Sequence, residues 1–406
     1  MSLLYDIREY IKSGETNEER LGLEIEHFII DKSGRQILLH DLSPLIEEVA
    51  NQLNAEIVTT DETVIGYITD DYAVSIEPSC QFEISINPYS EIEEIESIYD
   101  EFCLLWEPIF SKHGYEMVAR GILPMVENGS ITPGDIPLYG KKRYKYMDEY
   151  FETTGKYGKY MMRASASTQV SIDYKSEEDL VRKLRLLQKL SPIFMIMMES
   201  KNEEEVLSDT FEYPHLLRSQ VWDDLDPKRT GFYPGAYQED FGYRQIANTV
   251  YSTPLILLTD QGESVFVGDK SAKELEREGL IIDAAMDTQR KKSVVEHIFS
   301  MGFFHFRIKK FIEIRVADSV PIKKALGYVA LIKGIVYSDL NMELLEKELK
   351  DVRDTDMIQD AIDRIKKDGL NAIVYHNRSA KKWINRLKTM TQRGLSESER
   401  RYLIYV

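Results

Sequence analysis

Hydrophobic and polar residues alternate along four separate segments of this chain, whereas two longer segments repeat their apolar residues every three or four positions. Alternation with a period of two is typical of strands with one buried face, and the longer spacing is typical of amphipathic helices. In the segment GLEIEHFII, Leu23 and Ile25 alternate with Glu24 and Glu26. A strand would place these two carboxylates on one face, about 7 Å apart. The other alternating segments are IEPSCQFEIS, ASTQVSIDY and FRIKKFIEIRVAD.

The two helical segments carry recognisable start and stop signals. The first begins after Ser90, which together with Glu93 predicts a capping box, and Gly114 predicts its end. The second begins at Ser176, and Pro192 is expected to bend or end it. Both helices are expected to pack against the sheet.

Four amphipathic strands spread over three hundred residues predict an α+β fold. Its antiparallel sheet would have one face packed on helices and one polar face. No linker divides the chain, so we expect one large domain over residues 1–335, built on the sheet and its helices, and a helical segment over residues 336–406 packed on the same body. A sheet that simply exposes charged residues to water remains an alternative for any single strand.

The polar face is rich in acids, where lysine, serine and threonine would be usual. Like carboxylates gathered on one face repel each other unless cations lie between them. Magnesium with a nucleoside triphosphate is a common partner of such a face, and arginines beside it would meet phosphate oxygens. The residues concerned are Glu24, Glu26, Glu77, Glu83 and Glu313, with Arg307 and Arg315.

Composition narrows the class of protein. The 406 residues include 69 acids and 51 bases, a formal net charge of −18, which disfavours binding to nucleic acid or to an anionic membrane. No apolar run approaches the length of a membrane span, and the charged N-terminal residues do not resemble a signal peptide. Only two cysteines are present, Cys80 and Cys103, so we expect a cytoplasmic protein without a disulfide framework.

Other chemistries lack their motifs. Seven histidines are scattered without zinc spacing, and His27 is interpreted as structural. The segment GDIPLYGKK is one residue too long for a P-loop and has no hydroxyl residue after the lysine, so it is interpreted as a loop. Carboxylates near Cys80 would suppress its thiolate.

Six segments resemble those of glutamate–cysteine ligases of the plant-type and proteobacterial branch, and they occur in the family's order. They are GLEIEHF, SIEPSCQFEIS, IPLYGKKRYKYM, MMRASASTQVSIDY, RSQVWDDLDPKRTGF and FRIKKFIEIRVAD, and they span roughly residues 20–335. The resemblance implies a glutamine-synthetase-like fold, in which helices pack on the outer face of a curved antiparallel sheet. The inner, polar face of such a sheet binds metal ions, ATP and glutamate.

The resemblance also implies a reaction. The γ-carboxylate of L-glutamate is phosphorylated by ATP, and the amine of L-cysteine displaces phosphate from the γ-glutamyl phosphate. The products are γ-glutamylcysteine, a precursor in glutathione biosynthesis, with ADP and phosphate.

Roles for individual residues follow from the same resemblance. Glu313 and Arg315 would be catalytic, and Arg307, Lys309 and Arg315 would bind the phosphates of ATP. Glutamate would be bound by Arg163, Arg218, Trp222 and Arg229. Two or three magnesium ions would be held by Glu24, Glu26, Glu77, Glu83, Gln169 and Glu313.

One departure from the family pattern concerns the amine acceptor. Where relatives carry two glycines, in a pattern like E-P-G-G-Q-F-E, this chain has Ser79 and Cys80, whose side chains could narrow or polarise the acceptor side.

Three alternatives for the function stay open: a ligase for another small amine, an inactive relative that binds metal or glutamate, and a guanidino kinase. The last would need a reactive-cysteine motif that the sequence lacks. The oligomeric state is not given by the sequence.

Overall fold

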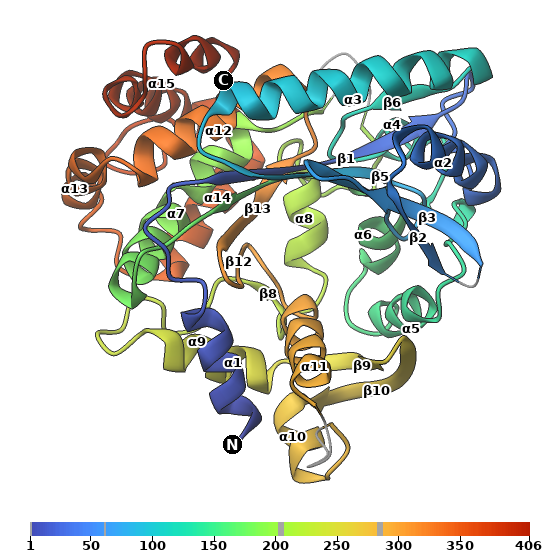
Figure 1. Ribbon diagram of the computed structural model, residues 1–406. Helices are drawn as coiled ribbons and strands as arrows, with labels where there is room; N and C mark the ends of the chain where they lie inside the picture. The colour runs from blue at the N-terminus through green and yellow to red at the C-terminus, as the bar shows by residue number, and fades with distance from the viewer. Residues whose placement is uncertain (1, 61, 202–206, 282–286) are drawn as a thin grey trace.

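A nine-stranded antiparallel sheet organises the computed structural model, which describes residues 2–60, 62–201, 207–281 and 287–406 (Figure 1). The central strand β1 (Leu21–Ile30) lies between β5 (Phe82–Tyr89) and β7 (Ser167–Ile172). The strand order is β12-β13-β7-β1-β5-β4-β3-β2, with β6 also paired to β1, so the sheet is not closed. The remaining strands are β2 (Glu56–Thr60), β3 (Thr63–Ile68), β4 (Tyr72–Ile76), β6 (Glu116–Val118), β12 (Phe306–Ile308) and β13 (Ile312–Asp318).

Four long helices pack against one face of this sheet. They are α2 (Leu39–Leu53) against β3, α3 (Ile92–His113) against β5, α7 (Glu177–Met197) against β13, and α12 (Ile322–Val336) against β1. In Figure 1, α3 and α12 run along the upper side of the sheet. Apolar residues of β1, such as Leu23 and Ile25, are fully buried beneath them. The predicted α+β fold with helices on one face of an antiparallel sheet is therefore confirmed.

The helix boundaries confirm part of the prediction. Ser176 caps α7 by accepting a hydrogen bond from the backbone of Asp179, and Gly114 ends α3 with a φ of 74°. The capping box at α3 is wrong, because the helix begins after Glu91 and no side chain caps it. Pro192 does not end α7 either. The Ser191 hydroxyl donates to the carbonyl of Gln188 at 2.8 Å, the acceptor that a proline nitrogen leaves unpaired.

The strand predictions are confirmed in GLEIEHFII and ASTQVSIDY, and in the second half of IEPSCQFEIS. The single strand expected in FRIKKFIEIRVAD is wrong. The segment forms a hairpin, in which β12 and β13 pair around a turn closed by the Lys309 amide, which donates to the carbonyl of Phe311 at 2.9 Å. Arg307 and Glu313 thereby face each other across the pair.

Shorter elements cover the polar face of the sheet. Three helices, α5 (Lys142–Phe151), α6 (Gly158–Ala164) and α8 (Leu217–Asp223), stand opposite it (Figure 1). Beyond them lie α1 (Leu3–Lys12), α9 (Tyr243–Ser252), α10 (Ala272–Arg277), α11 (Thr288–Ser300), β8 (Thr230–Gly231), β9 (Pro254–Asp260), β10 (Glu263–Ser271) and β11 (Phe303–Phe304).

The C-terminal helices pack on the outer layer. Helices α13 (Asp339–Glu348), α14 (Thr355–Asp368) and α15 (Ala380–Thr391) contact α7, and α13 and α15 also contact α12. The boundary expected at residue 335 falls in the last turn of α12. Across the described part of the chain, no helix is both long enough and apolar enough to cross a membrane.

Candidate active site

A cavity of about 430 Å³ lies between the polar face of the sheet and helices α5, α6 and α8. The strand register explains why its sheet wall is polar. Glu24 on β1 lies opposite Gln169 on β7 and Ser85 on β5, and the next outward-facing residue, Glu26, lies opposite Glu83. Period-two alternation on neighbouring strands therefore concentrates the carboxylates on one wall.

The acids on this wall repel one another. Glu26 and Glu83 are direct cross-strand neighbours, an arrangement that is destabilising for like charges. Burial, together with the charges of Glu24, Glu77 and Glu26, raises the pKa of Glu83 well above its usual range. Burial and the charge of Glu77 raise the pKa of Glu26 to about 7. Burial and the charge of Glu313 also raise the pKa of Glu24. These carboxylates lack sufficient positive charge from the protein.

Neutral donors hold two of the acids in place. Glu26 accepts hydrogen bonds from the Ser167 backbone amide at 2.7 Å, from the Ser167 hydroxyl at 3.0 Å and from the Gln169 amide at 3.1 Å. Glu83 accepts from Ser75 and Ser85, both at 3.1 Å. The carboxylates are thus oriented by groups that do not neutralise them.

Positive charge gathers at the other end of the wall, around Glu313. Arg307 binds this fully buried carboxylate at 2.6 and 2.9 Å, and Lys309 and Arg315 approach it at 2.9 and 3.0 Å. Burial alone would raise the pKa of Glu313, but these three cations hold it well below its usual range. Three cations against one carboxylate leave an excess of positive charge.

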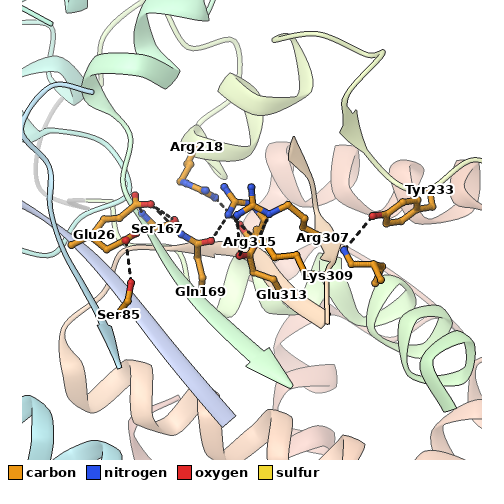
Figure 2. A network of polar contacts seen from close by, with 12 residues as sticks. Glu26, Ser85, Ser167, Gln169, Arg218, Tyr233, Arg307, Lys309, Glu313 and Arg315 are labelled. Carbon is orange, nitrogen blue, oxygen red and sulfur yellow. Dashed lines mark hydrogen bonds and ion pairs between the residues drawn. The ribbon is translucent and has the colours of Figure 1, made fainter. Parts of the chain in front are cut away.

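Figure 2 shows the two ends of this network and the link between them. Gln169 donates to Glu26 at one end, and its amide oxygen accepts from Arg315, which also contacts Glu313. The sheet therefore presents an acidic half and a basic half within one cavity.

Helix α8 supplies a wall opposite the sheet. The Arg218 guanidinium donates to the backbone carbonyl of Arg315 at 3.1 Å. The central carbon of this guanidinium, Cζ, lies 5.4 Å from the centre of the Trp222 ring. Burial lowers the pKa of Arg218 to about 10, so it remains a cation at neutral pH. Apolar side chains complete the lining, namely Met147, Met161, Met162 and Phe303.

The acidic half fits magnesium. Glutamate carboxylates are hard oxygen ligands, and burial and mutual repulsion raise the pKa values of Glu24, Glu26 and Glu83 in a way that a bound divalent cation would counter. No three carboxylates among Glu24, Glu26, Glu77 and Glu83, all of them described, bring their oxygens within 4.8 Å of one another. This spacing suits ions that are each held by one or two carboxylates and share their other positions with phosphate and water.

The six predicted magnesium ligands are therefore divided. The oxygens of Glu313 contact Arg307, Lys309 and Arg315, and the amide oxygen of Gln169 accepts from Arg315. The structure places these two residues in direct contact with cations, whereas Glu24, Glu26, Glu77 and Glu83 form no ion pair within 4.0 Å with any described residue, although Arg218, Arg307, Lys309 and Arg315 act on Glu24 or Glu26 from farther away.

Sequence comparison assigns this chain to a family. The model for glutamate–cysteine ligase family 2 matches residues 20–197 and 213–403 of the chain. The chain belongs to this family. The match continues well past residue 335, where the recognisable segments of the sequence end.

Relatives of the chain include plant glutamate–cysteine ligases. The chain is 24% identical over 341 residues to the chloroplastic glutamate–cysteine ligase of Medicago truncatula, which covers 83% of this chain and 65% of that protein. The identity is also 24% to the enzyme of Arabidopsis thaliana, over 84% of this chain and 64% of that protein. The chain thus spans slightly less than two thirds of the length of these relatives.

A solved structure supports the fold. The crystal structure of the glutamate–cysteine ligase from Francisella tularensis in complex with AMP matches 96% of this chain and 81% of its own, with a TM-score of 0.51 and 12% sequence identity. At this identity the likeness establishes a common fold.

Arg229, predicted to bind glutamate, does not line the cavity. It is fully buried, and its guanidinium donates to Asp226 at 2.7 Å, to the carbonyls of Pro254 and Met301 at 2.7 and 3.2 Å, and to Tyr150 at 3.2 Å. With its donors engaged inside the protein, Arg229 is a structural residue, so this part of the family-based prediction is wrong.

Arg163, also predicted to bind glutamate, lies outside the cavity lining as well. Its guanidinium pairs with Asp148 and donates to the carbonyl of Ile136 at 3.0 Å. These contacts join α6 to α5 and to the loop that precedes α5. The structure therefore corrects this prediction too, while Arg218 and Trp222 do line the cavity.

Ser79 and Cys80 do not narrow the cavity, contrary to expectation. Neither lines it, and the Ser79 hydroxyl donates to the carbonyl of Pro137 at 3.1 Å. Cys80 has a φ of 67°, in the left-handed region that favours glycine, and its side chain is buried in the core. The glycine in the family pattern suits this backbone conformation, not the shape of the cavity.

The sequence interpretation missed two cations, Lys141 and Arg143, at the start of α5. Both line the cavity, and the Arg143 guanidinium forms no hydrogen bond or ion pair with any residue that the structure describes. Burial lowers the pKa of Arg143, partly offset by Tyr144 and Glu77. A run of three basic residues in an acidic chain is the available signal, but the sequence interpretation places only its first two residues in a loop, GDIPLYGKK, and gives Arg143 no role.

Proposed function

We propose that this chain joins the γ-carboxylate of L-glutamate to the amine of L-cysteine, using ATP and two or three magnesium ions. One observation carries the proposal: a single cavity presents an acidic half, which suits magnesium, beside a basic half, which suits phosphate. Adjacent sites of opposite charge are what a reaction between a metal-bound nucleotide and a carboxylate requires.

The basic half would act in phosphoryl transfer. The γ-carboxylate attacks the γ-phosphorus of ATP, the bond to the ADP oxygen breaks, and an acyl phosphate forms. Arg307, Lys309 and Arg315 would contact the phosphoryl oxygens, while Glu313 keeps the three cations aligned. Magnesium, when bound by Glu24, Glu26, Glu77 and Glu83, would neutralise charge on the phosphates.

The second step needs an amine held beside the acyl phosphate. The neutral amine attacks the acyl carbon, the carbon–oxygen bond to phosphate breaks, and the amine proton passes to solvent. Arg218 and Arg143 suit the α-carboxylate groups of amino-acid substrates, because both are cations at the cavity wall, Arg218 buried and Arg143 partly buried.

Room for the rest of ATP is provided by a second cavity. It measures about 420 Å³ and shares Glu24 with the first. Its lining includes Arg20, Asn87 and Asp173, which offer hydrogen bonds to ribose or base. We assign the nucleoside to this cavity and the phosphates to the side of Glu24 that faces Glu313.

L-Cysteine is the proposed acceptor because the remaining wall is apolar. Met147, Met161 and Met162 supply polarizable thioethers beside Trp222, a surface that suits a small thiol side chain. Another small amine remains the second candidate. An apolar wall discriminates between substrates that differ by one methylene with a free-energy difference of only ~1–3 kcal/mol.

The test measures ADP release from ATP and glutamate with each of several amines: cysteine, 2-aminobutyrate, alanine and glycine. Mass detection of the products identifies what was joined. Cysteine is expected to give the highest kcat/KM, with 2-aminobutyrate measurable and the smaller amines poorer. A different amine that exceeds cysteine tenfold would keep the ligase and change the product. No amine-dependent ADP release would contradict the function.

A matched pair of variants tests the metal wall. Glu24→Gln is expected to lower turnover roughly a hundredfold or more, because it removes a charge-matched magnesium ligand. Glu149→Gln on the exposed side of α5 is the control and is expected to retain activity. Near-normal activity of folded Glu24→Gln at limiting magnesium would refute the metal assignment.

We also propose a cytoplasmic location, because both Cys80 and Cys103 are free thiols. Fractionation of the source cells with an antibody against the chain tests this, and recovery in another compartment would refute it.

A further inference from the structure

A small void lies directly behind the α8 wall of the active-site cavity. Its volume is about 20 Å³, and its lining includes Arg218, Trp222, Phe303 and Arg315, which also line the cavity, together with His305, which does not. The void is about the size of one water molecule, for which ~10–15 Å³ is sufficient.

Three buried nitrogen atoms on the lining residues of this void have no hydrogen-bond partner in the protein. They are Nε of Arg218, Nε1 of Trp222 and Nε2 of His305. The Arg218 and His305 residues are 5% and 7% exposed, respectively. Buried polar groups are rarely left unpaired, because the lost hydrogen bond is not compensated.

The chemistry of the three atoms is complementary. Arginine Nε and tryptophan Nε1 only donate hydrogen bonds, whereas Nε2 of a neutral histidine accepts one when the proton is on Nδ1. Burial lowers the pKa of His305 to about 4, so its ring is neutral at physiological pH. A water molecule accepts two hydrogen bonds and donates one, which satisfies all three groups.

We propose that this void holds one ordered water molecule that links His305 to Arg218 and Trp222, which makes His305 a positioning residue for the α8 wall. Arg218 and Trp222 face the cavity on their other side, so the water would fix their orientation toward the substrate. The kinetic part of this inference rests on the proposed function, but the presence of the water does not.

The backbone around His305 is firmly held. Its amide donates to the carbonyl of Gly231 at 2.9 Å, its carbonyl accepts from the Arg315 amide at 3.0 Å, and its ring packs edge-on against Phe232 at 4.9 Å between centres. A rigid acceptor of this kind can set the position of more mobile side chains.

The nearest acid does not compete for His305. Asp223 Oδ1 lies 3.9 Å from His305 Nε2, beyond hydrogen-bond distance, and Asp223 Oδ2 lies 2.7 Å from Nζ of Lys366 on α14. Lys366 thereby offsets the charge of Asp223, the residue that follows Trp222. A helix of the C-terminal segment consequently contributes to the support of this wall.

The direct test is a high-resolution crystal structure of the full chain without substrates. An ordered water within hydrogen-bond distance of all three nitrogen atoms is expected. A void without density, or a rearrangement in which the three atoms find protein partners, would overturn the proposal. This result does not depend on which reaction the protein catalyses.

Variants test whether the water positions the wall. His305→Phe keeps a planar aromatic ring, although a larger one, and removes the acceptor. The KM for glutamate is therefore expected to rise about tenfold, as loss of a hydrogen bond to a charged group predicts, with the KM for ATP unchanged. His305→Gln, which retains an acceptor, is expected to restore most of the loss.

His297→Phe is the control. His297 is another buried histidine, and it contacts the carbonyl of Leu257 at 2.9 Å away from the void. The His297→Phe variant is expected to lower the melting temperature without changing the ratio of the KM for glutamate to the KM for ATP. If His305→Phe behaves in the same way, or if His305→Gln fails to restore the KM for glutamate, His305 has only a packing role.

Discussion

At Glu26, burial and hydrogen bonding act in opposite directions on one carboxyl group. Burial and Glu77 raise its pKa to about 7, although Arg218, Arg315 and the Ser167 amide all lower it. Near neutral pH the group is therefore poised between its two protonation states. A divalent cation beside it would favour the ionised form.

Magnesium binding is consequently expected to depend on pH. Protonated Glu26 is a poor ligand, so magnesium affinity should fall about tenfold for each pH unit below 7 and level off above it. Calorimetry in buffers of different ionisation enthalpy should show proton release at pH 7. Glu26→Gln serves as the control, and an equal pH dependence in that variant would point to another group.

The same carboxyl group makes stability depend on pH in the absence of metal. A raised pKa in the folded state stabilises the protein fully below the ordinary value near 4.5, and this contribution is lost as pH rises through about 7. The loss amounts to roughly 3 kcal/mol at 1.36 kcal/mol per pKa unit. Denaturant titrations of the wild type and Glu26→Gln between pH 5 and 8 should diverge progressively from pH 5 to about pH 7 and run parallel above it. Curves that stay parallel over the whole range would contradict the prediction.

At the scale of elements, the segment between α8 and β8 depends on one buried ion pair. Arg229 and Asp226 lie 2.7 Å apart with no appreciable exposure, and the arginine also joins β9 to the end of α11 through backbone carbonyls. The pair fixes the position of the chain that follows the α8 wall.

Arg229→Met is therefore expected to reduce stability by ~3–5 kcal/mol, because it leaves Asp226 buried without its partner. Below the melting temperature, the KM for glutamate should stay within a few-fold of normal. Urea denaturation and steady-state kinetics measure the two effects. A stable variant with a strongly raised KM for glutamate would restore the role first expected of Arg229.

The strand carboxylates were located correctly from the sequence, whereas one of the two arginines was not. Strand alternation is local, so it located Glu24 and Glu26 on the correct face. Arg218 and Arg229 stand in similar motif contexts, but only tertiary packing against Tyr150 and Pro254 turns Arg229 inward. The β12–β13 turn was missed because Lys309, Lys310 and Phe311 carry no turn signal.

On the scale of the whole molecule, the C-terminal segment covers the outer helical layer. The short helix η4 (Glu399–Tyr405) packs on α12, with Tyr402 and Leu403 almost fully buried. Gly327 on α12 permits this approach, since a Cβ there would lie 2.9 Å from the Tyr402 carbonyl. Helix α12 in turn packs on the central strand of the active site.

Deleting residues 399–406 is expected to destabilise the whole catalytic body, not the C-terminal helices alone. Loss of Tyr402 and Leu403 should remove roughly 3–6 kcal/mol at about 1.5–3 kcal/mol for each buried side chain. Thermal unfolding should remain a single transition at lower temperature. Ile404→Ala, at a residue that is 72% exposed, is the matched control and should have little effect. Two separate transitions would indicate that the segment folds independently.

The loop of Cys80 has a consequence for redox chemistry in a cell. If the acceptor is cysteine, the protein works in constant contact with free thiols. Its own thiol, Cys80, lies only a few residues from Glu77 in the cavity lining. Burial raises the pKa of Cys80 to about 12, so it scarcely ionises at neutral pH. Because thiol–disulfide exchange proceeds through the thiolate, the Glu77 loop resists mixed disulfides with oxidised substrate. The protein is then expected to tolerate cystine without losing the carboxylate that this loop carries.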